Sequence, residues 1–157
     1  ASAASRPHFW QVAQNMVKDY PLGVGPQCYR EYYNLYDFSD GHFGRNRDVH
    51  SSHFQILADI GYMGALLWVS MFTYAYWVLF RTRGLVKRNS EKFENPFFYK
   101  HLCNALICSQ SAAIFAGSFY SMGYNDLIWL NWGLAIIVSG LVNKELDQFN
   151  NQLRTNS

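Results

Sequence analysis

Residues 60–80, IGYMGALLWVSMFTYAYWVLF, decide the fold, because these 21 consecutive residues include no Asp, Glu, Lys, Arg or His. A helix of about 20 apolar residues crosses a hydrocarbon core about 30 Å thick. The stretch therefore predicts a membrane-spanning helix. Two more charge-free stretches predict spans at residues 101–122 and 127–143. The former carries small residues that suit helix packing in lipid, and the latter begins with tryptophans, which favour the membrane interface.

The charged residues are concentrated at one end of the chain. Of the 157 residues, 50% are hydrophobic and 15% are charged, with a formal net charge of +2. This apolar content excludes a disordered protein, and the weak, scattered charge excludes nucleic acid as a partner. The mean hydropathy of −0.14 conceals a separation. Residues 1–59 hold eleven of the 24 charged residues and four of the five histidines, so polar chemistry is expected there.

The basic residues predict how the spans are oriented. Residues 81–100 contain six basic and two acidic residues, whereas the connection 123–126 contains no basic residue. By the positive-inside rule, the former loop is cytoplasmic and the latter is extracytoplasmic. Residues 1–59 then lie outside the cytoplasm and the tail 144–157 lies inside it. The expected fold is an all-α integral membrane protein, with three transmembrane helices preceded by an extracytoplasmic segment of short helices and loops.

Local signals predict the helices of the extracytoplasmic segment. Arg6-Pro7 is typical of a helix start, and Pro21 is expected to end that helix. A stripe of tyrosines with helical spacing predicts a second helix, followed by a polar loop over residues 37–48. Ser52 and Gln55 have the spacing of a capping pair, so a third helix should begin at Ser52 and continue into the first span. Asn95-Pro96 likewise predicts the start of the second span.

Two ordered motifs resemble those of the O-antigen ligase and polymerase superfamily. His50-Ser51, nine residues and then Gly61-Tyr-Met-Gly64 fit the family pattern H-[N/S/Q]-x9-G-x-x-[G/T/Y]. Upstream, the chain is similar to the family segment R…W…A…M…D-x-P-L-G-x-G, with Arg6, Trp10, Ala13, Met16 and Asp19-Tyr-Pro-Leu-Gly-Val-Gly25 at the matching positions. The resemblance covers roughly residues 5–80.

The resemblance implies a glycosyltransferase of the bacterial inner membrane that acts at the periplasmic face. Such enzymes transfer a glycan from an undecaprenyl pyrophosphate carrier to the lipid A core, another lipid-linked repeat unit or a protein. Neither a cofactor nor a metal is implied. The chain begins without Met, and three spans cannot enclose a carrier lipid and an acceptor. We therefore expect it to be the C-terminal portion of a larger multi-span bundle, with further spans and a second essential arginine upstream.

His50 and Arg6 are the candidate catalytic residues. His50 lies just before a predicted helix N-terminus, whose dipole disfavours the imidazolium, so a neutral ring could act as general base or position the acceptor. Arg6 could hold the pyrophosphate with its guanidinium fork. The alternatives are a histidine that only hydrogen-bonds its loop and an arginine that anchors a lipid headgroup.

Six further residues are weaker candidates for substrate binding. The arginines could contact phosphate or glycan, or could simply be solvated. The tyrosines could stack on sugar rings, although packing of their helix is the commoner use of such a stripe. The acidic residue could pair with Arg6, or could mark the water boundary of a span. These candidates are Arg30, Arg45, Arg47, Tyr32, Tyr36 and Asp126.

Two other functional classes compete with the glycosyltransferase. One is a non-catalytic membrane subunit of polysaccharide assembly or export, whose periplasmic loop only binds glycan. The other is a metal-dependent hydrolase, for which His42, His53, Asp40 and Asp48 offer ligand types without ligand spacing.

Chelation separates the hydrolase from the arginine-based mechanism. We expect glycan transfer by membranes containing the complete protein to continue after treatment with EDTA, because a guanidinium takes the role that a metal would have at the pyrophosphate. Loss of transfer on chelation, restored by added divalent cation, would favour the metal-dependent class.

Overall fold

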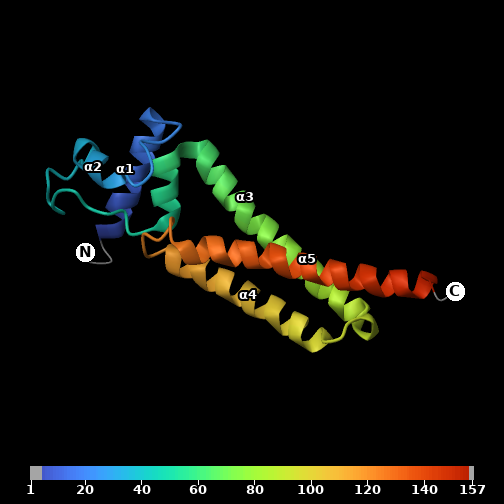
Figure 1. Ribbon diagram of the computed structural model, residues 1–157. Coiled ribbons are helices and arrows are strands. Elements are labelled where there is room, and N and C mark those ends of the chain that lie inside the picture. Colours follow the sequence, from blue (N-terminus) through green and yellow to red (C-terminus); the bar gives the residue numbers. More distant parts are fainter. Residues whose placement is uncertain (1–4, 156–157) are drawn as a thin grey trace. The chain divides into compact units, whose positions relative to one another are not determined.

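The computed structural model describes residues 5–155, and all the regular secondary structure in this part of the chain is helical (Figure 1). The helices are separated by irregular loops, and no strand occurs among the described residues. In chain order they are α1 (Arg6–Asp19), α2 (Tyr29–Tyr36), α3 (Ser52–Arg88), the 3-10 turn η2 (Ser90–Lys92), α4 (Pro96–Gly117) and α5 (Asp126–Thr155). The all-α expectation is thus confirmed.

The chain divides into two compact units, each with its own contacts. The first unit comprises Ala1–Ser70 together with Ala113–Asn125, and the second comprises Met71–Ala112 together with Asp126–Ser157. Helices α3 and α4 are each divided between the two units, α3 after Ser70 and α4 after Ala112. The first unit contains both family-like motifs.

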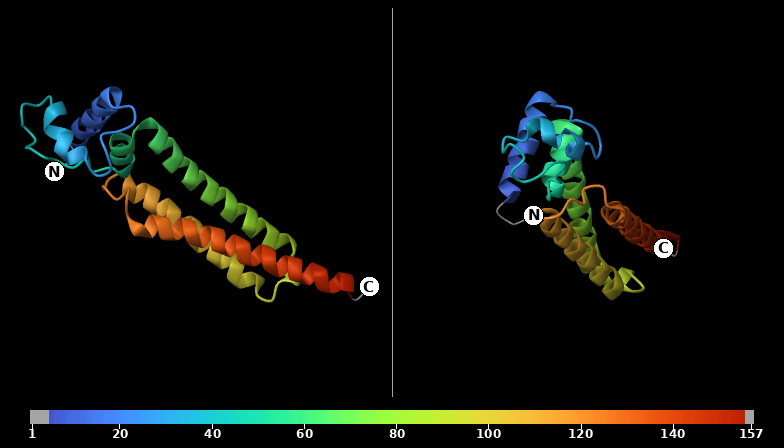
Figure 2. Two further views of the ribbon diagram at one scale, coloured as in Figure 1. Left: turned by 45° about the horizontal axis from the view of Figure 1, so that its top comes forward. Right: turned by 90° about the vertical axis from the view of Figure 1, so that its left-hand side faces the viewer.

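Helices α1 and α2 form the core of the first unit and lie beside the first turns of α3 in both views of Figure 2. Helix α1 begins at Arg6 and ends before Pro21, as predicted. Its apolar stripe is fully buried, and the Tyr29 hydroxyl donates a 2.9 Å hydrogen bond to the Phe9 carbonyl oxygen. Tyr33, which like Tyr29 belongs to the tyrosine stripe of α2, is also buried. Packing, rather than exposure to sugars, is therefore the role of these two tyrosines.

Helix α3 begins at Ser52, as predicted, but its backbone breaks at Gly61 (φ 69°, ψ −169°). The break frees the Ala58 carbonyl, which the Tyr62 N–H would reach in a regular helix. The Pro21–Gly25 loop takes up the freed groups. Tyr62 N–H donates to the Pro21 carbonyl at 3.0 Å, and the N–H groups of Val24 and Gly25 donate to Ala58 and Asp59 at 3.0 and 2.9 Å.

The side chain of Asp59 fixes the start of α2. Asp59 is fully buried, and its carboxylate accepts 2.9 Å hydrogen bonds from the N–H groups of Gln27 and Tyr29. Tyr29 is the first residue of α2, so the carboxylate satisfies a donor that the helix itself leaves unpaired. A negative charge at a helix N-terminus is also favourable to the helix dipole.

The predicted capping pair at the start of α3 serves a different purpose. The Ser52 hydroxyl donates to the Tyr120 carbonyl at 2.7 Å and accepts from the Met122 N–H at 2.9 Å, while the Gln55 side-chain oxygen accepts from the Gly123 N–H at 3.3 Å. Both side chains therefore clamp the loop 118–125 onto α3. The local capping pattern could not predict these partners, because the loop lies far away in the sequence.

The second unit contains the C-terminal part of α3, the N-terminal part of α4 and the whole of α5. Helix α4 begins at Pro96, as predicted, and the Asn95 side-chain oxygen caps it by accepting from the Phe98 N–H at 3.1 Å. The Tyr99 hydroxyl of α4 donates to the Glu145 carboxylate of α5 at 2.8 Å. Helix α5 extends through the predicted polar tail to Thr155.

Two helices of the described chain, α3 and α5, are long and apolar enough to cross a membrane. They contain the first and third predicted spans. The second predicted span, 101–122, is not shown as one: α4 ends at Gly117, and residues 118–122 lie in the clamped loop. Polar residues in α4 lower its hydropathy, namely Asn104, Ser109, Gln110 and Ser111.

Gly61→Ala should destabilise the first unit far more than a change of backbone preference alone. A Cβ at Gly61 would lie 2.5 Å from the Leu22 carbonyl carbon and 2.6 Å from the Gly23 nitrogen, against the paired loop. Gly41 is the matched control, because it has φ +80° and open space around it. We expect Gly41→Ala to cost about 1–2 kcal/mol and Gly61→Ala clearly more, measured by thermal unfolding in detergent. Equal shifts in Tm would refute the steric role of the loop.

Candidate active site

The first unit brings Arg6 and His50 together from distant parts of the chain. Arg6 is the first residue of α1, and its guanidinium carbon lies 5.4 Å from the centre of the Phe119 ring. His50 lies two residues before α3, and its ring centre is 5.9 Å from that of Phe9, which is about one turn beyond Arg6. The positive charge of Arg6 is close enough to lower the pKa of His50.

The surroundings of His50 favour the neutral imidazole. Burial is the main cause that lowers its pKa below the ordinary value of about 6.5; Arg6 and Arg47 also lower it, while the carboxylate of Asp48 opposes them. His50 makes no hydrogen bond with the other described residues, so a ring nitrogen is open to an incoming proton. Its backbone has φ +51°, a left-handed conformation that is uncommon outside glycine and costs roughly 1 kcal/mol or more.

The three weaker arginine candidates are dispersed. The Arg30 Nε donates to the Asn46 carbonyl at 2.8 Å, and the Arg47 Nε donates to the Phe43 carbonyl. Arg45 lines a separate cavity of about 310 Å³ together with Asp37. Of the three, Arg47 lies close enough to His50 to affect its pKa.

The remaining candidates are held mainly by structural contacts. The Tyr36 hydroxyl donates to the Asp19 carboxylate at 2.8 Å, and this hydrogen bond raises the pKa of Tyr36 to about 12. The Tyr32 ring packs edge-on against Tyr20, with ring centres 5.7 Å apart. Asp126 is an exposed first residue of α5 and belongs to the second unit.

A buried pair of His8 and Asp37 was not predicted as part of any site. His8 Nε2 lies 2.9 Å from an Asp37 oxygen, with both side chains 8% exposed. The Asp37 carboxylate also accepts from the N–H groups of Ser39 and Gly41 at 3.0 and 2.9 Å. The pair therefore ties the polar loop 37–48 to α1. Asp37 ends a tyrosine-rich helix just before a loop, which is the one local signal that could have indicated this anchor.

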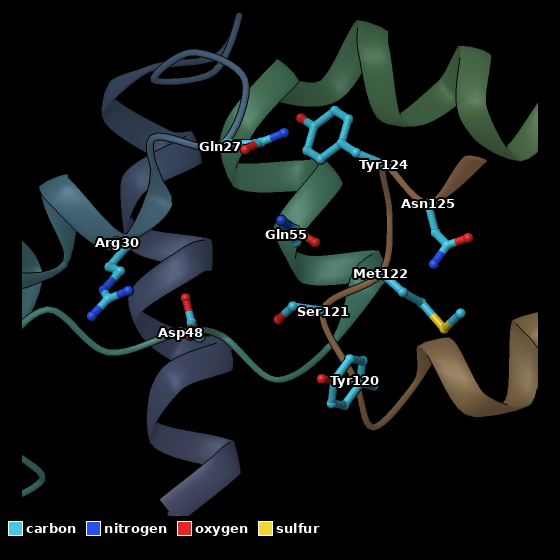
Figure 3. A pocket seen from close by; sticks show the side chains of 9 residues that line it. All are labelled: Gln27, Arg30, Asp48, Gln55, Tyr120, Ser121, Met122, Tyr124 and Asn125. Atoms are coloured by element: carbon cyan, nitrogen blue, oxygen red, sulfur yellow. The ribbon is translucent and has the colours of Figure 1, made fainter. Parts of the chain in front are cut away.

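A polar cavity of about 440 Å³ lies between α3 and the clamped loop (Figure 3). Its walls carry Arg30 and Asp48 on one side and Tyr120, Ser121 and Tyr124 on the other, with Gln55 between them. Neither Arg6 nor His50 lines it. Among residues 5–155, no group of three His, Cys, Asp or Glu side chains is arranged to hold a metal ion.

The fold defines an all-helical protein with two helices capable of crossing a membrane, and with an arginine and a histidine close together in its polar unit. A model of the O-antigen ligase family matches residues 1–69. This match covers less than half of the 157 residues, and it confirms over residues 1–69 the resemblance predicted from the two motifs. Comparisons with curated proteins and with solved structures gave no match.

The electrostatic contacts of His50 can be tested by an NMR titration of the labelled imidazole. Arg6→Gln should raise the His50 pKa, because it removes a positive charge that disfavours the imidazolium, and Asp48→Asn should lower it, because it removes a stabilising negative charge. Arg45→Gln serves as control and should leave the titration unchanged. If neither Arg6→Gln nor Asp48→Asn changed the His50 pKa, the three groups would not be neighbours in the membrane-embedded protein.

Proposed function

We propose that this protein transfers a glycan from undecaprenyl pyrophosphate to an acceptor hydroxyl, with Arg6 holding the pyrophosphate and His50 acting as general base. The observation that carries the proposal is the proximity of Arg6 to a half-buried His50, whose pKa is lowered, within the segment that matches the O-antigen ligase family. The match of residues 1–69 to the O-antigen ligase family points to glycan ligation in lipopolysaccharide or surface polysaccharide biosynthesis. Donor, acceptor and residue roles are the parts proposed.

The proposed reaction needs one base and one anion clamp. The acceptor oxygen attacks the anomeric carbon and forms the new glycosidic bond, and its proton passes to a ring nitrogen of His50. The bond between the anomeric carbon and the phosphate oxygen breaks, and the pyrophosphate leaves with the electron pair. A guanidinium can stabilise the leaving charge by paired hydrogen bonds. Burial and the charge of Arg6 both lower the His50 pKa, which favours the unprotonated ring that a general base requires.

The proposed location is the bacterial inner membrane, with residues 1–59 in the periplasm. The two helices long enough to span a membrane and the basic loop 81–100 support this orientation. We keep helix α4 as a second span in the proposal, ending at Gly117 rather than at residue 122, since it connects the basic loop with the loop that contacts Arg6. The acceptor is the lipid A core, a second lipid-linked glycan or a protein.

Replacing His50 or Arg6 should abolish transfer without preventing membrane insertion. We expect His50→Ala in the complete protein to lower the rate about 10²- to 10⁴-fold, the usual contribution of a general base. Arg6→Lys should retain part of the activity that Arg6→Ala loses, because lysine keeps the charge but not the planar fork. The measurement is glycan transfer in membranes, normalised to the amount of inserted protein.

His42→Ala is the matched control, because His42 is an exposed histidine of the adjoining loop. It should transfer glycan at the unsubstituted rate. Undiminished transfer by inserted His50→Ala or Arg6→Ala would overturn the catalytic assignment and favour the non-catalytic subunit.

A further inference from the structure

We propose that the 440 Å³ cavity between α3 and the clamped loop binds an uncharged sugar unit of the glycan. The inference rests on the proposed function, because it takes the glycan as the substrate, but it concerns a site separate from Arg6 and His50. The cavity has the size of a small-molecule site, for which volumes of about 300–1,000 Å³ are usual.

The polar groups on its walls include both donors and acceptors that are not used by the protein. The Asp48 carboxylate accepts no hydrogen bond from the described residues, and Arg30 uses only Nε, leaving its two terminal nitrogens available. The Ser121 hydroxyl is buried and has no hydrogen-bond partner among the described residues. A sugar ring presents several hydroxyl groups, each both donor and acceptor, and satisfies such a mixed set.

The charge of the cavity distinguishes a sugar from a phosphate. Arg30 and Asp48 contribute one positive and one negative group, and they form no ion pair with each other in the described structure. The remaining polar groups are amides and hydroxyls, which are neutral. A pyrophosphate would meet the Asp48 carboxylate without a second cation to offset it, so the anion is better placed at Arg6. The cavity suits an uncharged ring instead.

The wall formed by the clamped loop is held in place by hydrogen bonds to α3. Ser52 binds both sides of Ser121 through the Tyr120 carbonyl and the Met122 N–H, and Gln55 holds Gly123. Figure 3 shows the Ser121 and Tyr120 side chains extending from this loop towards the side that carries Asp48. A preorganised wall of this kind lowers the conformational cost of binding.

The cavity adjoins the proposed reacting centre at two points. Asp48 acts on the pKa of His50, and Tyr120 directly follows Phe119, whose ring lies under the Arg6 guanidinium. A sugar in the cavity would thus lie in the same part of the first unit as the proposed base and the proposed pyrophosphate ligand. The position fits a subsite that selects which sugar is joined.

The test uses saturation-transfer NMR with the complete protein in nanodiscs, at about pH 8, where His50 is neutral in every variant. The probes are the methyl glycosides of glucose and N-acetylglucosamine, the methyl glycoside of glucuronic acid, and inorganic pyrophosphate. We expect the neutral glycosides to bind at millimolar concentration, the acidic one to bind more weakly, and pyrophosphate not to displace them. Asp48→Asn and Ser121→Ala should each weaken binding of the neutral glycosides about 10-fold.

Asp40→Asn and Ser118→Ala are the matched controls, because these residues carry the same groups but do not line the cavity. They should bind the neutral glycosides normally, and thermal unfolding should show that all four variants are folded. The inference is overturned if the neutral glycosides do not bind, if pyrophosphate displaces them, or if Asp48→Asn and Ser121→Ala bind as well as the controls. Loss of transfer in His50→Ala with sugar binding intact would leave both proposals standing. Sugar binding with full transfer in His50→Ala would remove only the catalytic one.

Discussion

The first unit depends on the broken backbone of α3 at Gly61 and on the loop that repairs it. A helix that breaks in an apolar setting leaves backbone donors and acceptors without partners, which costs free energy unless other groups replace them. Here the Pro21–Gly25 loop supplies the replacements through three backbone hydrogen bonds of 2.9–3.0 Å. The motif that ends at Gly25 and the motif that contains Gly61 are therefore distant in the sequence but joined by these hydrogen bonds.

That contact positions the site through a short series of connections. The repaired break orients Asp59 towards the start of α2, and Tyr29 of α2 in turn binds the backbone of α1. Arg6 begins α1, whereas His50 immediately precedes the first turns of α3. Neither residue is placed by its own neighbours alone. Each is placed by the helix it precedes or begins, and the helices are held together by the loop at the break.

The sequence predicted what short-range chemistry controls. The proline and capping patterns predicted where α1, α3 and α4 begin, and the length of the apolar run predicted the long helix α3. The break at Gly61 could not be predicted, because a glycine in an apolar run does not reveal which distant loop will pair with it. For the same reason, the pattern at Ser52 predicted a local cap, although the hydroxyl binds a loop nearly seventy residues away. Long-range partners are decided by packing, which a local pattern does not contain.

The candidate site shows the same division between local and long-range information. Motifs singled out Arg6 and His50 by residue type and spacing, but the cavity is built from Asp48, Gln55 and Ser121, which no motif groups together. The arrangement separates two chemical demands. A pyrophosphate needs a concentrated positive charge, the role proposed for Arg6 beside the Phe119 ring, while a sugar needs many weak, directional partners without net charge. Placing both demands in one pocket would let the carboxylate of Asp48 repel the leaving group. With separate sites, as proposed, the Asp48 carboxylate would bind sugar hydroxyls and still oppose the lowering of the His50 pKa that burial and Arg6 cause.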